Sequence, residues 1–228
     1  MTQAVGRNAV LAGGSGLVGA RLLALLLGAG EYARVLALSR RPLVVDHPRL
    51  ANRVVRSGVA LEGQIRGLQC QDAFCCLGST LRDAGSREAF RAVDHDLVLE
   101  FARLALAAGA GRLVVVSAVG ADAASGNFYL RVKGETERAL EALRFRSLDI
   151  MAPSVLLGAR RIVRPLELLA QGALWVVNPL LLGGATRFRG IPAGTVAAAM
   201  LGAARSGRSG VNRYGYAQMR ALARAPGL

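Results

Sequence analysis

The stretch Val10-Leu-Ala-Gly-Gly-Ser-Gly-Leu-Val-Gly19 decides the fold of this 228-residue chain. It connects an apolar run, residues 9–12, to a second apolar segment, residues 17–27, through a cluster of glycines. A short apolar run that stops at glycines and is followed by a longer apolar segment is typical of a buried strand, a tight turn and a helix. The N-terminal part of the chain is therefore predicted to be a strand–turn–helix unit.

The glycines of this stretch have the spacing that a bound dinucleotide requires. Gly13 permits the sharp turn, Gly16 lets a pyrophosphate approach the backbone, and Gly19 lets the helix pack closely against its strand. The phosphates then face free N–H groups at the positive end of the helix. A glycine-rich turn in another kind of α/β protein is the alternative. The residues expected to hold the cofactor here are Gly13, Ser15, Gly16, Leu17, Val18 and Gly19.

Apolar runs and helical patterns alternate along the rest of the chain. The predicted strands are residues 34–39, 53–56, 71–78, 112–117 and 148–153, and the predicted helices are residues 86–108, a helix that begins near 127, 165–175, 194–205 and 214–224. Strands that alternate with helices indicate an α/β fold, a doubly wound parallel sheet (Rossmann fold) with helices on both faces. We expect one NAD(P)-binding domain over residues 1–228, in which residues 159–228 form a small C-terminal extension on the substrate side.

The end of the second strand indicates which cofactor is bound. An acidic residue at this point binds the ribose 2′-hydroxyl and favours NAD. This chain has Ser39-Arg40-Arg41 instead, and a guanidinium group suits a 2′-phosphate. The sequence therefore favours NADP over NAD, with Arg40 and Arg41 as the cofactor-binding residues. The alternative is that both are ordinary surface arginines.

Tyr129 and Lys133 are the candidate catalytic pair. Residues at i and i+4 lie on the same face of a helix, and Lys133 is the only lysine in a chain with 29 basic residues. Ser117 ends the preceding strand, and the loop after it is long enough to bring its hydroxyl toward Tyr129. The alternative is an ordinary tyrosine and lysine on an amphipathic helix.

Composition excludes several other classes of protein. The chain has 53% hydrophobic and 19% charged residues, so it is not disordered. Its formal net charge is +14, but the arginines are spread along the whole chain without a basic tail or interleaved aromatic residues. We therefore expect no nucleic-acid partner and interpret the arginine content as a compositional bias with a preference for anionic ligands.

The cysteines and histidines indicate neither a disulfide framework nor a metal site. Cys70, Cys75 and Cys76 are predicted to be reduced and buried, and His47 and His95 are too far apart in sequence for ligand spacing. No signal peptide is recognisable, and polar residues interrupt the apolar stretch 166–184. The sequence therefore predicts a cytoplasmic protein without membrane insertion.

Five blocks together resemble the short-chain dehydrogenase/reductase superfamily, and more narrowly its atypical branch around the Tat-interactive oxidoreductase proteins. The blocks are residues 13–19, 74–80, 93–96, 116–122 and 129–135, in the order of that family. Two departures stand out: Ala118 and Val119 follow Ser117 where many catalytic relatives have more hydroxyls, and Ala152 precedes Pro153 where relatives often have arginine.

The resemblance implies an NADP(H)-dependent oxidoreductase that transfers a hydride to or from a small carbonyl or alcohol. It implies Tyr129 as the general acid/base, Lys133 as the ammonium that lowers the tyrosine pKa and binds the nicotinamide ribose, and Ser117 as the group that holds the substrate oxygen. Further cofactor contacts are expected at Leu77, Gly78, Ser79, Pro153 and Val155. The alternatives are a nucleotide-binding regulatory protein without turnover and an enzyme similar to sugar-nucleotide epimerases. The chain is expected to be a monomer or a homodimer.

Overall fold

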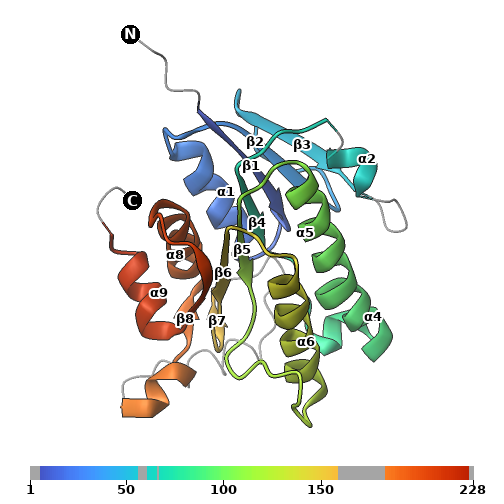
Figure 1. Cartoon of the computed structure of the whole chain (residues 1–228), viewed down its shortest axis with the longest axis vertical. Coiled ribbons are helices and arrows are strands. Elements are labelled where there is room, and N and C mark those ends of the chain that lie inside the picture. Colours follow the sequence, from blue (N-terminus) through green and yellow to red (C-terminus); the bar gives the residue numbers. More distant parts are fainter. Residues whose placement is uncertain (1–5, 56–60, 66, 159–182, 226–228) are drawn as a thin grey trace.

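The computed structural model describes residues 6–55, 61–65, 67–158 and 183–225. Its centre is a seven-stranded parallel sheet with the order β3-β2-β1-β4-β5-β6-β9 (Figure 1). The strands are β1 (Arg7–Ala12), β2 (Tyr32–Ser39), β3 (Leu50–Val54), β4 (Asp72–Cys75), β5 (Arg112–Val116), β6 (Ser147–Met151) and β9 (Gly210–Tyr214). A separate short pair is formed by β7 (Leu156–Leu157) and β8 (Ile191–Pro192). The predicted doubly wound α/β fold is confirmed.

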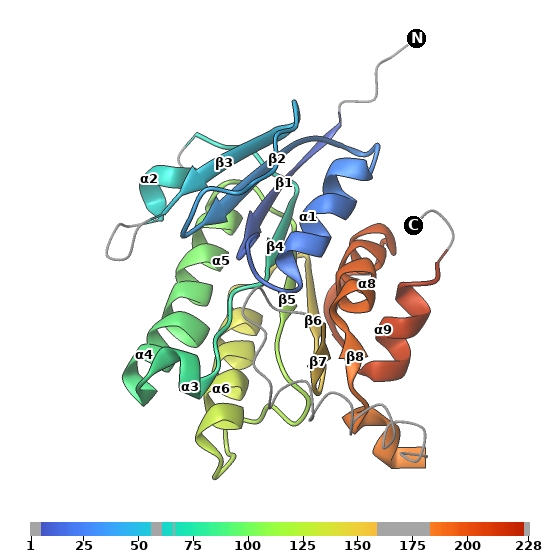
Figure 2. The same cartoon turned by 180° about the vertical axis from the view of Figure 1, so that it is seen from behind.

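Helices cover both faces of the sheet. They are α1 (Gly19–Gly28), α2 (Glu62–Ile65), α3 (Leu81–Ala84), α4 (Arg87–Arg91), the π-helical segment η1 (Ala92–Asp96), α5 (Leu97–Ala107), α6 (Phe128–Ala142), the 3₁₀ segment η3 (Gly183–Phe188), α8 (Ala193–Arg205) and α9 (Tyr216–Leu222). Figures 1 and 2 show α1, α8 and α9 on one side of the sheet and α5 and α6 on the other.

The alternation of side chains along the strands produces these two layers. Successive strand residues point to opposite faces of a sheet, so Leu11 of β1 packs in the same core as Leu22 of α1 and Met200 of α8. Its neighbour Val10 packs in the other core, with Phe101 of α5. The central strands are therefore mostly apolar, as expected for parallel strands buried on both faces.

Three elements differ from the predicted ones. The predicted helix 86–108 is a continuous helical run over residues 87–107, but η1 inserts a π-helical turn between α4 and α5. The strand β9 was not predicted, because it is an edge strand with mostly exposed residues and so has no apolar run. The strand β3 covers residues 50–54 rather than 53–56. The predicted helix 165–175 lies outside the described residues.

The topology creates a ligand-binding position between β1 and β4. The chain passes from β1 to β2 and β3 on one side, and then crosses to β4 on the other side. Ligands of doubly wound sheets bind at the carboxyl ends of the strands where the order reverses in this way. Gly13 follows β1, and the segment Leu77–Ser79 follows β4, so both predicted cofactor segments lie at this reversal.

Candidate functional site

The glycines after β1 are required by close packing. Gly13 has a φ of 81°, and a Cβ atom there would lie 2.6 Å from the carbonyl oxygen of Cys76. A Cβ atom on Gly19 would lie 2.1 Å from the carbonyl oxygen of Gly13, so any larger residue would push α1 away from the turn. Ser15 and Gly16 are exposed. The turn therefore leaves its outer backbone open to a ligand.

The N-terminus of α1 is suited to a phosphate group. No side chain caps this end of the helix, and its first turn has no acidic residue. The preceding turn is closed by a hydrogen bond from the Gly16 N–H to the Gly13 carbonyl oxygen, 2.9 Å long. Leu17 is partly buried beside the turn and Val18 is buried. The positive end of the helix dipole thus faces the site without a competing carboxylate.

Arg40 and Arg41 are exposed directly after β2. The Ser39 hydroxyl donates to the carbonyl oxygen of Arg41 over 2.7 Å, and the Asn52 amide donates to the Ser39 hydroxyl over 2.9 Å. These bonds fix the backbone that carries both arginines at the carboxyl edge of the sheet. No acidic residue occurs between positions 32 and 45, so this edge offers a nucleotide guanidinium groups rather than a carboxylate.

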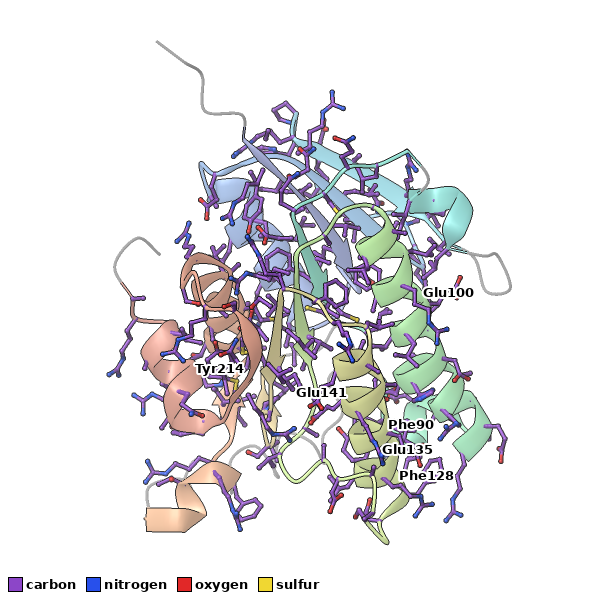
Figure 3. All side chains as sticks on the ribbon, viewed as in Figure 1. Phe90, Glu100, Phe128, Glu135, Glu141 and Tyr214 are labelled. Atoms are coloured by element: carbon purple, nitrogen blue, oxygen red, sulfur yellow. The ribbon has the colours of Figure 1, made fainter. Side chains whose placement is uncertain are left out.

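The helix α6 carries Tyr129 and Lys133 on one face. Asn127 caps this helix by accepting a hydrogen bond from the Leu130 N–H over 3.2 Å. The Tyr129 ring packs against Phe90, with ring centroids 5.4 Å apart. Figure 3 shows Phe90 beside Phe128, the residue that begins α6, and their ring centroids are 6.0 Å apart. Aromatic packing between α4 and α6 thus fixes the first turn of α6, where Tyr129 lies.

The Lys133 ammonium is paired with a buried carboxylate. Its Nζ lies 2.7 Å from Oδ1 of Asp94, which is fully buried in η1. The other oxygen, Oδ2, accepts hydrogen bonds from the Ser79 N–H at 2.8 Å and from the Ser79 hydroxyl at 2.7 Å. Gly78 lies against the pair, since a Cβ atom there would be 3.4 Å from Oδ1. The structure therefore brings together Gly78, Ser79 and Lys133 around Asp94.

The Lys133 charge is one of three influences on the Tyr129 phenol. The Lys133 charge was expected to lower the Tyr129 pKa. Burial has the larger effect and raises that pKa above its usual value, the Lys133 charge opposes the rise, and the Asp94 charge adds to it. The carboxylate beside Lys133 thus offsets part of the ammonium charge that the phenolate needs.

Ser117 directly follows β5 and contacts the same face of α6 farther along the helix. Its hydroxyl donates to Oε1 of Glu137, one helical turn beyond Lys133 and two turns beyond Tyr129. Oε2 of Glu137 pairs with Arg213 of β9, which also donates to the Ala118 carbonyl oxygen over 3.0 Å. A void of about 10 Å³ lies between Asp94, Lys133, Ser117 and Glu137, roughly the space of one water molecule.

Sequence reasoning missed three of these residues. Asp94 belongs to the block 93–96 that carried the resemblance, so its place in that block was a usable signal. Glu137 is eight residues after Tyr129 and so falls on the same helix face. No sequence feature marked Arg213 as a site residue, because it lies on the unpredicted strand β9 and is one arginine among many.

The remaining predicted residues lie along the ends of the central strands. The Pro153 carbonyl oxygen accepts a hydrogen bond from the Val119 N–H over 2.9 Å, and the Val155 carbonyl oxygen accepts from the Ile191 N–H over 2.8 Å. The Val155 side chain is exposed, and Leu77 is partly buried. Among the described residues no cluster of histidine, cysteine or carboxylate side chains is arranged to hold a metal ion.

The thiols have little access to solvent. Cys70 and Cys75 are buried, Cys76 is partly buried, and all three thiols are free. Burial raises the pKa of Cys70 to about 11 and that of Cys75 to about 12. These cysteines therefore pack as small apolar residues of the strand β4 and its surroundings.

Comparison by sequence identifies two groups of relatives. The chain is 38% identical over 168 residues to Protein HTATIP2 of Rattus norvegicus, covering 72% of this chain and 69% of that protein. It is 34% identical over 186 residues to the mitochondrial protein fmp52 of Emericella nidulans, covering 78% of this chain and 80% of that protein. No family model matches the chain.

Solved structures share the fold at low sequence identity. MoeE5, in a complex with UDP-glucose and NAD, has a TM-score of 0.65 at 18% identity, over 91% of this chain and 76% of that chain. The human epimerase family protein SDR39U1, in a complex with NADPH, has a TM-score of 0.60 at 17% identity, over 91% of this chain and 74% of that chain. At such identity the likeness supports the architecture alone.

The comparisons correct the predicted location. The prediction of a cytoplasmic protein is contradicted, because relatives from several fungi are named as mitochondrial FMP52 proteins. The sequence prediction rested on the lack of a recognisable signal peptide and on the interrupted apolar stretch 166–184, and neither feature identifies a mitochondrial protein. In the parts of the chain that the structure describes, no helix has both the length and the apolar character needed to cross a bilayer.

Proposed function

Since the chain belongs to the atypical branch of the short-chain dehydrogenase/reductase superfamily, we propose that it is an NADP(H)-dependent oxidoreductase that acts on a small carbonyl or alcohol. The observation that carries the proposal is the placement of Tyr129 and Lys133 on one face of α6, with Lys133 next to the segment Leu77–Ser79 at the sheet reversal. A nicotinamide dinucleotide bound along this edge supplies or accepts the hydride.

The cofactor part of the proposal rests on the carboxyl edge of the sheet. The uncapped N-terminus of α1 receives the pyrophosphate. Arg40 and Arg41 take the 2′-phosphate, because a guanidinium group donates two parallel hydrogen bonds to phosphate oxygens. Pro153 and Val155 line the nicotinamide end. The preference for NADP over NAD depends on the two arginines alone.

The chemical part rests on Tyr129. Its hydroxyl donates a proton to the carbonyl oxygen during reduction and accepts the proton during oxidation. Lys133 supports the phenolate by its charge and binds the cofactor ribose. Its ion pair with Asp94 engages one carboxylate oxygen, and an ammonium has three N–H donors, so Lys133 can also donate to the ribose. Ser117 can hold the substrate oxygen only if its hydroxyl leaves Glu137.

The substitution Tyr129→Phe tests the proposal. We expect turnover of a carbonyl substrate to fall by about a hundredfold or more, while the affinity for NADPH, measured by fluorescence titration, stays within about twofold of the parent value. Tyr216→Phe on α9 is the matched control and should change neither quantity. Full turnover in the Tyr129→Phe variant would remove the proposed acid/base.

A second candidate function is supported by the hydrogen bonds of the site. Ser117 is held by Glu137, and burial raises the Tyr129 pKa, so the site suits a protein that binds the nucleotide and signals its presence without turnover. This alternative predicts saturable NADPH binding and no NADPH oxidation across a broad carbonyl panel. Oxidation that depends on Tyr129 would exclude it.

A further inference from the structure

A basic hollow lies at the opposite end of the sheet from the nucleotide site. It has a volume of about 670 Å³ and is lined by residues at the amino ends of β1 and β5, residues just before β2 and β6, and the segment between α8 and β9. The lining residues are Arg7, Glu31, Arg112, Arg146, Ala204, Arg205, Gly207, Arg208 and Ser209. Its volume falls in the range of small-molecule sites.

The floor of this hollow is a satisfied polar network. Arg112 donates to Oδ2 of Asp149 over 2.5 Å and to the carbonyl oxygens of Ala203 and Arg208 over 2.9 and 2.8 Å. The hydroxyl of Tyr214, on β9, donates to the other oxygen of Asp149 over 3.0 Å. The network holds the hollow in shape, since each of its charges already has a partner.

Two further cations of the rim are also paired. Arg7 lies 3.0 Å from Oδ2 of the buried Asp72, and Arg205 lies 2.6 Å from Oε1 of Glu31. Together with Arg112 and Asp149 these pairs balance three arginines against three carboxylates.

The two remaining arginines of the hollow, Arg146 and Arg208, have no carboxylate partner in these three pairs. Both are exposed, and within the described parts of the chain no carboxylate lies within 4.0 Å of either guanidinium. Arg146 extends along Gly111, where a Cβ atom would lie 3.5 Å from its Nε. The hollow therefore has two guanidinium charges in excess, in a concave place where neighbouring charges reinforce one another.

We propose that this hollow binds a small phosphate-bearing anion, with Arg146 and Arg208 as the groups that grip it. Guanidinium groups bind phosphate oxygens through paired, charge-assisted hydrogen bonds, and an anion with two or more charges neutralises the excess. The described lining residues include no aromatic side chain, so bases of a single-stranded nucleic acid find no stacking surface. The site does not depend on the proposed oxidoreductase activity.

Calorimetric titration with inorganic pyrophosphate tests the site. The full-length protein is titrated with and without saturating NADPH, so that binding at the glycine turn is separated from binding at the hollow. We expect one saturable site that remains when NADPH is present. Arg146→Ala and Arg208→Ala should each weaken it by about tenfold, the loss typical of one charge-assisted contact.

The matched controls are Arg103→Ala on α5 and Arg138→Ala on α6, which remove the same charge from exposed positions outside the hollow. They should leave pyrophosphate affinity within about twofold. Equal losses in all four variants would mean diffuse attraction to a basic protein and would overturn the proposal. Complete loss of pyrophosphate binding when NADPH is present would assign the binding to the nucleotide site. Arg146→Lys and Arg208→Lys, which keep the charge but lose the planar fork, should give intermediate affinities.

Discussion

A buried ion pair lies near the amino ends of the parallel strands (the amino edge) and another near their carboxyl ends (the carboxyl edge). The two pairs differ in how they are hydrogen-bonded. At the amino edge Arg112 faces Asp149, and the hydrogen bonds around this pair all join it to other fixed groups of the fold. At the carboxyl edge Lys133 faces Asp94, but Oδ1 of Asp94 has no aligned hydrogen bond among the described residues. Both carboxylates are fully buried.

The two pairs differ in whether the cation is free to bind a ligand. A guanidinium that donates to three acceptors of the fold is held in one place, and removing it leaves the buried Asp149 carboxylate without its cation. An ammonium that contacts one carboxylate oxygen can turn toward a ligand at small cost, because its three donors are compact and rotatable. A fully bonded buried pair therefore indicates a structural role, and an incompletely bonded one beside open backbone indicates a site.

Replacing Arg112 gives the largest expected effect. Arg112→Met leaves Asp149 buried without its cation, and we expect a loss of about 3–5 kcal/mol in the free energy of unfolding. Arg205→Met is the control, because its pair with Glu31 is partly exposed and should contribute about 1 kcal/mol or less. Denaturant unfolding of both variants measures the difference. A loss below about 1 kcal/mol for Arg112→Met would contradict the structural role.

Replacing Gly19 gives a smaller effect at the carboxyl edge. The added methyl of Gly19→Ala meets the Gly13 carbonyl oxygen at 2.1 Å, so we expect a loss of about 1–3 kcal/mol in stability and weaker NADPH binding. Gly28→Ala, in the same helix, has no atom within 4 Å of its new methyl and should leave both quantities almost unchanged or add slightly to stability. Unchanged NADPH affinity in Gly19→Ala would separate the turn from the cofactor site.

The sequence predicted the parts of the molecule that have a strong local pattern. The apolar strands, the glycine turn and the long helices follow from burial and spacing, as at Val10–Gly19 and at Tyr129 and Lys133. The edge strand β9 was missed because its residues are mostly exposed. The π-helical turn η1 was missed because nothing in the spacing of residues 86–108 distinguishes it from a continuous helix.

The site was predictable in its residue types and less so in its partners. Gly78, Ser79 and Lys133 were predicted, but the carboxylate that joins them was not, because the pairing of Asp94 with Lys133 depends on how η1 packs against α6. The hydrogen bond between Ser117 and Glu137 depends on the position of α6 over β5, and Arg213 reaches it from a strand that lies far along the chain. Such pairings are set by tertiary packing, which local pattern does not encode.

The smallest expected effect concerns the charge beside Tyr129. The Asp94 carboxylate raises the Tyr129 pKa, so Asp94→Asn should lower it. Oxidation of an alcohol needs the phenolate as base, so its rate rises as the pH increases through this pKa, and the rise should move to lower pH in the variant. Tyrosinate absorbance, compared with that of Tyr129→Phe, measures the same shift without turnover.

Asp96→Asn is the matched control for this measurement. Asp96 belongs to the same segment η1, but its side chain is 62% exposed and pairs with His95, so solvent screens its charge from Tyr129. A shift to higher pH in Asp94→Asn would mean that the carboxylate acts mainly by keeping the Lys133 ammonium in place beside the phenol. In that case Asp94 holds Lys133 as firmly as Asp149 holds Arg112, and the proposed contrast between the two edges of the sheet fails.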